Sequence, residues 1–136
     1  MLSDKCGGFK MRTTALAVLL SVSATTLAGY SVYRPEADCE GEDLVVRAPL
    51  PSNELRAVQL KSRPTVDFKR YGGRDLWMLF PSAPYSNEPR TWYLLPHDEF
   101  YEWVKERHGN TPRWAECWHY PSVSASLRSF REKWAL

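Results

Sequence analysis

The chain has 136 residues, of which 43% are hydrophobic and six are tryptophan, so it can form one compact core but is too short for two ordinary domains. We therefore expect a single domain over residues 1–136, with residues 1–10 as a flexible N-terminus. The formal net charge of +2 arises from 18 basic and 16 acidic residues. Such a small excess gives by itself no indication of a nucleic-acid or acidic-membrane partner.

The first thirty residues have two interpretations. Lys10 and Arg12 precede the run Thr13 to Ala28, which is rich in Ala, Leu, Val, Ser and Thr and is typical of a secretory signal peptide. The run is too short and too polar for a transmembrane helix, which needs about 20 mostly apolar residues. The same run also fits a buried first helix that Gly29 ends. Both interpretations remain open at this point.

The cysteine count does not decide between them. Cleavage after Ala28 would remove Cys6 and leave Cys39 and Cys117 as a possible disulfide pair in an oxidising compartment. Three free thiols in a cytosolic protein are equally ordinary.

The segment after Gly29 predicts three strands. Tyr30 to Arg34 is a short β-prone run, and Asp43 to Arg47 and Glu54 to Ser62 flank a turn by composition, so they predict a hairpin centred near Pro51. In that hairpin Asp43 lies opposite Gln59, and Lys61 shares their face. The other face is apolar and consists of Leu44, Val46, Val58 and Leu60. We expect this face to pack against the first helix.

Four more elements follow along the chain. Asp75 to Phe80 and Thr91 to Leu95 are β-prone, while His97 to His108 and Ser124 to Trp134 have helical spacing of apolar residues. Between Lys61 and Arg74 the charge is mostly positive. The basic residues there are Lys61, Arg63, Lys69, Arg70 and Arg74, against Asp67 alone. This stretch suits either contact with phosphate or a merely solvated face.

The chain contains, in order, a helix, Gly-Tyr, a strand, Asp43-Leu44-Val45-Val46, a turn and Val58-Gln59-Leu60-Lys61. This order resembles the core of the PD-(D/E)XK nuclease superfamily. The match covers Thr13 to Lys61 in detail, and Arg70 to Phe80 and Trp92 to Asp98 look like later core elements. The resemblance implies an α/β, restriction-endonuclease-like fold. Its first helix would pack on a mixed sheet of about four to five strands, followed by two C-terminal helices.

The resemblance also implies a chemistry. In that family two residues hold Mg²⁺ for phosphodiester cleavage. One is an Asp that opens a strand, and the other is an acidic residue that lies two positions before a Lys on the next strand. Carried over, Asp43, Gln59 and the Leu60 carbonyl would hold Mg²⁺ or Mn²⁺, and Lys61 would position the attacking water. Arg63, Lys69, Arg70 and Arg74 would hold the nucleic-acid backbone. We therefore expect a cytoplasmic endonuclease that acts on DNA or structured nucleic acid, with a possible homodimer and no membrane partner.

Two departures from the family pattern leave alternatives. Gln stands at position 59 where Glu or Asp is usual, and no carboxylate occurs between Met11 and Tyr30. One alternative is a catalytically degenerate domain of the same fold that binds nucleic acid or protein. The other is a small exported protein with a cleaved leader and a Cys39 to Cys117 bridge. A zinc site would draw on His97, His108, Cys117 and His119, but these lack the paired spacing of closed zinc sites.

Overall fold

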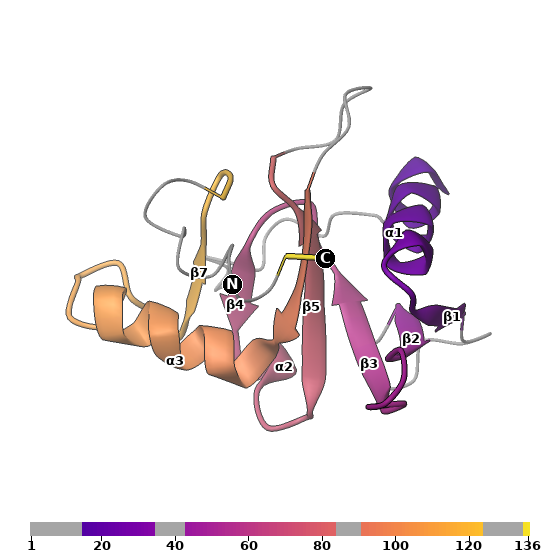
Figure 1. The fold of residues 1–136 in the computed structure, drawn as a ribbon. Coiled ribbons are helices and arrows are strands. Elements are labelled where there is room, and N and C mark those ends of the chain that lie inside the picture. The colour runs from indigo at the N-terminus through magenta and orange to yellow at the C-terminus, as the bar shows by residue number, and fades with distance from the viewer. Residues whose placement is uncertain (1–14, 35–42, 84–90, 124–134) are drawn as a thin grey trace.

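The computed structural model describes residues 15–34, 43–83, 91–123 and 135–136, which form a mixed α/β fold with a five-stranded sheet (Figure 1). The elements in chain order are α1 (Ala15–Leu27), β1 (Ser31–Tyr33), β2 (Leu44–Arg47), β3 (Leu55–Leu60), β4 (Thr65–Asp67), α2 (Phe68–Tyr71), β5 (Leu76–Pro81), β6 (Trp92–Pro96), α3 (His97–His108) and β7 (Cys117–His119). The α/β class and the five-stranded mixed sheet agree with the expectation from sequence.

The main sheet has the strand order β1-β2-β3-β5-β6. Its neighbours are antiparallel except β3 and β5, which run parallel. A parallel neighbour requires a crossover connection, and β4 and α2 supply it here. β4 also pairs with β7 in a separate antiparallel ribbon, with Thr65 opposite His119.

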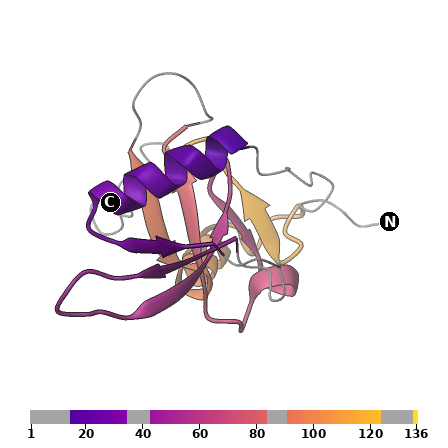
Figure 2. The same cartoon turned by 90° about the vertical axis from the view of Figure 1, so that its right-hand side faces the viewer.

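Helix α1 covers one face of the sheet, and Figure 2 shows it crossing in front of the strands. The helix ends at Leu27. Gly29 follows with a positive φ of 93°, which suits glycine, and the N–H of Tyr30 donates to the Thr25 carbonyl at 3.0 Å. Leu20, Val22 and Ala24 pack against the buried residues of this face. Those buried residues are Leu44, Val46, Val58, Leu60, Leu79, Trp92 and Leu94. The predicted packing of the first helix on the hairpin is therefore confirmed.

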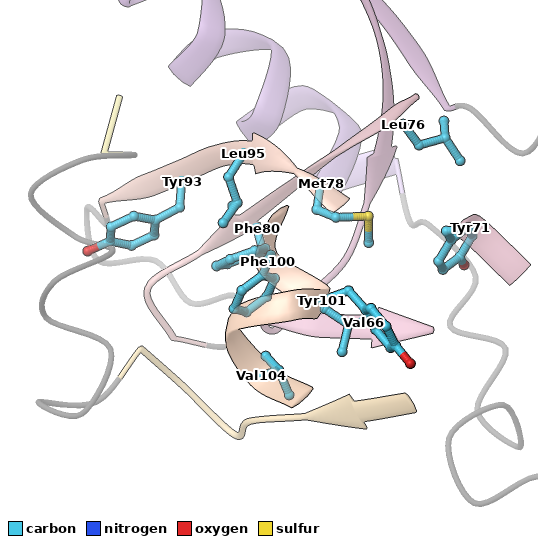
Figure 3. Packing of buried hydrophobic residues seen from close by; sticks show 10 residues of the cluster. All are labelled: Val66, Tyr71, Leu76, Met78, Phe80, Tyr93, Leu95, Phe100, Tyr101 and Val104. Carbon is cyan, nitrogen blue, oxygen red and sulfur yellow. The ribbon is translucent and has the colours of Figure 1, made fainter. Parts of the chain in front are cut away.

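The opposite face packs against α3 and the β4–β7 ribbon. Ten buried residues form this second cluster, which Figure 3 shows: Val66, Tyr71, Leu76, Met78, Phe80, Tyr93, Leu95, Phe100, Tyr101 and Val104. The rings of Phe80 and Phe100 lie 5.8 Å apart between centroids and join β5 to α3. Among the helices in the described part of the chain, none is long and apolar enough to cross a membrane.

The predicted elements agree with the observed ones to within two residues at most boundaries. His97–His108 is a helix as predicted. The ribbon of β4 and β7 and the short α2 were not predicted, because each has only three or four residues and no periodic pattern can be read from so few. The predicted helix at 124–134 and the expected flexible segment 1–10 lie outside the described residues.

Candidate functional site

The β2–β3 hairpin brings Asp43 beside Gln59. Leu44 pairs with Val58 and Arg47 with Leu55, so the hairpin is centred at Pro51 as the turn composition predicts. Asp43 directly precedes β2, and its N–H donates to the carbonyl of Val58, the residue that pairs with Leu44, at 2.7 Å. The predicted juxtaposition of residues 43 and 59 is present, because their side chains are hydrogen-bonded.

One carboxylate oxygen of Asp43 accepts two hydrogen bonds. The Gln59 side-chain Nε2 donates to Asp43 Oδ2 at 2.7 Å, and the Leu60 backbone N–H donates to the same oxygen at 2.9 Å. The nitrogen of the Gln59 amide must face the carboxylate, because its oxygen would repel a second oxygen at that distance. Asp43 therefore fastens the start of β2 to the end of β3.

These contacts bear on whether a divalent metal would fit. Mg²⁺ prefers one or two carboxylates and further oxygen ligands. Asp43 is a single carboxylate, Gln59 turns its nitrogen toward it, and within the described ranges no three His, Cys, Asp or Glu residues are placed to share a metal ion. A metal on Asp43 Oδ2 would have to displace both donors, so the arrangement as it stands does not fit Mg²⁺ there. Metal binding by Asp43, Gln59 and Leu60 stays a prediction.

Lys61 lies on the same face as Gln59. Its backbone N–H donates to the Leu79 carbonyl at 3.0 Å and continues the parallel pairing with β5, so side chains keep alternating. Its Nζ lies 5.1 Å from the centroid of the Tyr71 ring, which belongs to the cluster on the α3 side of the sheet. Gln59 and Lys61 therefore share a face as predicted, and Asp43 is joined to Gln59 by a hydrogen bond; the common direction of the Asp43 carboxylate and the Lys61 amine stays a prediction.

Arg70 approaches the same ring from α2. Its guanidinium carbon lies 5.6 Å from the Tyr71 centroid. Helix α2 is fixed at its start by Asp67, whose Oδ1 accepts from the Arg70 backbone N–H at 3.2 Å. Two cations from different elements thus converge on one buried tyrosine, a contact that electrostatic attraction to the ring favours.

The structure divides the basic stretch into two places. Lys69, Arg70 and Arg74 are exposed on α2 and the turn that follows it. Arg63 is half-buried and lines a cavity beside β7, and the described lining of that cavity includes none of the other three. β4 thus lies between Arg63 and the other three basic residues along the chain, and the sequence did not show this separation.

Sequence reasoning missed a buried polar network around His97, which is fully buried at the start of α3. Its Nε2 accepts from the Asp67 backbone N–H at 3.0 Å, so its proton is on Nδ1, which donates to Asp98 Oδ1 at 2.8 Å. Asp98 Oδ2 accepts from the Gly73 N–H at 2.9 Å. Burial lowers the pKa of His97 and outweighs the opposing effects of Asp98 and Asp67. This network joins α3 to β4 and to the turn after α2.

His97 makes the stability of the fold depend on pH. Its folded pKa lies below the ordinary value of 6.5, so between the two values the unfolded chain binds more protons and acid favours unfolding. We expect wild type to lose at most about 1.4 kcal/mol through His97 from about pH 7.5 to about pH 5.5, as measured by urea unfolding. His97→Gln should show a smaller loss, and an unchanged loss would contradict this assignment. Some dependence should remain, because the pKa values of His108 and His119 are also lowered by burial.

Three of the four residues considered for zinc, Cys117, His97 and His108, serve other contacts. Cys117 is disulfide-bonded, and the chain has only Cys6 and Cys39 as further cysteines, both outside the described residues. The His97 Nε2 already accepts a backbone N–H. His108 stacks on Trp118 with 4.2 Å between centroids, and its Nε2 lies 2.8 Å from the Tyr120 hydroxyl. These contacts leave no shared ligand set among the four residues.

Comparisons with protein-family models, with curated proteins and with solved structures find no match to this chain. Functional assignment therefore depends on the residues and contacts described above.

Proposed function

We propose that this chain is a nucleic-acid-binding domain with a restriction-endonuclease-like core, in which Lys61 and Arg70 contact phosphate and Asp43 has a structural role. The convergence of these two cations on Tyr71 carries the proposal. A polyanion gains most from basic side chains that are already positioned, because less side-chain freedom is lost on binding.

Three further observations support the proposal. α1 precedes three antiparallel strands, as the resemblance requires, and Asp43 directly precedes the second of them. Gln59 lies near the end of the third strand and Lys61 directly follows that strand, and both face the α3 side of the sheet. Lys69 and Arg74 are exposed close to Arg70 in the chain and extend the basic surface. The hydrogen bonds from Gln59 and Leu60 occupy the Asp43 oxygen that a catalytic metal would need, so they favour nucleic-acid binding without cleavage.

Salt dependence tests this function. We expect a labelled duplex of about 20 base pairs to bind, with affinity falling steeply between about 50 mM and about 200 mM NaCl. Arg70→Ala should weaken binding several-fold and reduce the salt slope by about 1, because one phosphate contact is lost. Lys105→Ala, which removes an exposed cation from α3, is the matched control and should bind like wild type. Binding that ignores both salt and Arg70→Ala would contradict the proposal.

Metal-dependent cleavage stays a prediction of the resemblance, and product analysis decides it. Wild type and Lys61→Ala are incubated with plasmid, single-stranded and branched substrates and Mg²⁺ or Mn²⁺. We expect no product. Metal-dependent product that disappears in Lys61→Ala would instead establish the nuclease. A homodimer likewise stays a prediction.

The disulfide at Cys117 favours a second candidate, an exported protein. Stable disulfides are typical of oxidising compartments outside the cytosol. The test is the intact mass of the protein from its own cells under non-reducing conditions. Loss of residues up to about Ala28, together with the two hydrogens of one disulfide, would establish export. A full-length mass would favour the nucleic-acid-binding domain with α1 retained.

A further inference from the structure

A cavity of about 620 Å³ lies between the β4–β7 ribbon and the loop that follows α3. Its basic lining residues are Arg63, Arg113 and His119. Its apolar wall comes from Trp118, Pro112 and Pro121. This size lies within the range of small-molecule sites, about 300 to 1,000 Å³.

The ionisable side chains that carry charge in the described part of the lining are all basic. None of the described lining residues is acidic, and neither Arg63 nor Arg113 forms an ion pair within the described parts of the chain. Both arginines lie close enough to His119 to lower its pKa further, after the larger effect of burial. Three basic side chains from three separate segments therefore face one space without a counter-charge in the described lining.

Backbone contacts fix the segments that carry these side chains. The Tyr120 N–H donates to the Pro64 carbonyl at 2.9 Å, and the Thr65 hydroxyl donates to the Arg63 carbonyl at 2.9 Å. The loop before Trp114 is held by the Thr111 N–H, which donates to the His108 carbonyl at 3.0 Å. The basic groups thus project from backbone that is already ordered.

The apolar wall is also held in place. Trp118 stacks on His108 with the two rings only 10° from parallel, and Tyr120 contacts the far nitrogen of that imidazole. A planar ligand group would meet this aromatic and proline surface while an attached anion reached the arginines, which bind carboxylate and phosphate through paired donors.

We propose that this cavity binds a small molecule in which a phosphate or carboxylate group is attached to a flat, apolar ring. The site is separate from the surface around Tyr71 and goes beyond the proposed nucleic-acid binding. With either head group the ligand is an anion that carries a planar ring.

Calorimetry on the full chain tests the proposal with three probes that share one ring: phenyl phosphate, benzoate and phenol. We expect at least one anion to bind and phenol not to bind, and the tighter anion identifies the head group. Arg113→Ala should weaken that anion at least about tenfold, since one charge-assisted contact is lost. Arg113 is exposed, so the variant should fold. Lys69→Ala is the matched control and should bind the anion as wild type does.

Three outcomes would overturn the proposal. The first is that neither anion binds at about 1 mM, a weak-binding limit. The others are that phenol binds as well as the anions, or that Arg113→Ala binds the anion as wild type does. NMR shifts of the His119 imidazole during the phenyl phosphate titration should locate binding at the cavity. Failure of duplex DNA to bind would leave these results unchanged, so the two proposals fail separately.

Discussion

Gln59→Glu is expected to destabilise the folded protein by about 2 to 3 kcal/mol when no divalent metal is present, because a charge-assisted hydrogen bond becomes a contact between two carboxylates. The Gln59 amide nitrogen lies 2.7 Å from Asp43 Oδ2, so a carboxylate in its place meets like charge at close range. Added Mn²⁺ or Mg²⁺ should restore much of this loss, because the variant offers the paired carboxylates that such ions prefer. Thermal unfolding with and without metal measures both effects.

Gln59→Met is the control for this substitution. It removes the same hydrogen-bond donor without adding charge, so it should cost about 1 kcal/mol and show no response to metal. Wild type should not respond either. If Gln59→Glu were as stable as wild type without metal, the hydrogen-bonded role of Asp43 would be wrong.

Removal of residues 1–28 is expected to abolish cooperative folding, which is the largest effect that the structure predicts. α1 covers Leu44, Val46 and Val58, each fully buried, and Leu60, which is 4% exposed. Burial of one such side chain contributes about 1.5 to 3 kcal/mol, so uncovering the four removes an amount comparable with the whole stability of a domain, about 5 to 15 kcal/mol. Circular dichroism and two-dimensional NMR of the shortened chain measure the outcome.

A matched pair of substitutions makes the same test without truncation. Ala24→Asp places a charge where α1 meets the sheet and should destabilise by about 2 to 4 kcal/mol. Leu27→Asp adds the same charge at a position that is 89% exposed and should have little effect. If the shortened chain folds cooperatively with its Cys117 disulfide intact, α1 is a removable leader and the exported protein is the correct interpretation.

The hairpin could be predicted because its information is local. Alternating apolar residues in two short segments, with a proline-containing turn between them, determine both the register and the face of each side chain. Asp43 therefore contacts Gln59 as expected, and the apolar face lies under α1. Gly29 ends that helix for an equally local reason.

The parts that the sequence did not show depend on long-range contacts. Thr65 pairs with His119 across more than fifty residues, and β4 and β7 are too short to have a pattern of their own. The sequence around His97 indicates a helix start and does not indicate burial. The imidazole can be buried because Asp67 and Asp98 satisfy both of its ring nitrogens. The cavity beside β7 follows from the same ribbon, since the pairing of β4 with β7 brings Arg63, which precedes β4, to the same cavity as Arg113 of the loop before β7.

The site itself was predictable in its placement but not in its bonding. The sequence predicts Asp43, Gln59 and Lys61 on one face; the structure places Gln59 and Lys61 there and joins Asp43 to Gln59 by a hydrogen bond. A glutamine can offer either its oxygen or its nitrogen, so the sequence alone does not say whether residue 59 joins Asp43 as a ligand or donates to it. The 2.7 Å contact through Nε2, together with the Leu60 N–H, favours the donor role.

Paramagnetic line broadening by Mn²⁺ tests most directly whether protein donors, rather than a metal, engage the Asp43 carboxylate. The Leu60 backbone N–H, which lies 2.9 Å from Asp43 Oδ2, is the reporter in an NMR titration of the wild-type chain. We predict no selective broadening of this signal at Mn²⁺ concentrations that broaden it in Gln59→Glu. Selective broadening of the Leu60 N–H signal in wild type at those concentrations would show that Mn²⁺ binds the Asp43 carboxylate, and would contradict its structural role.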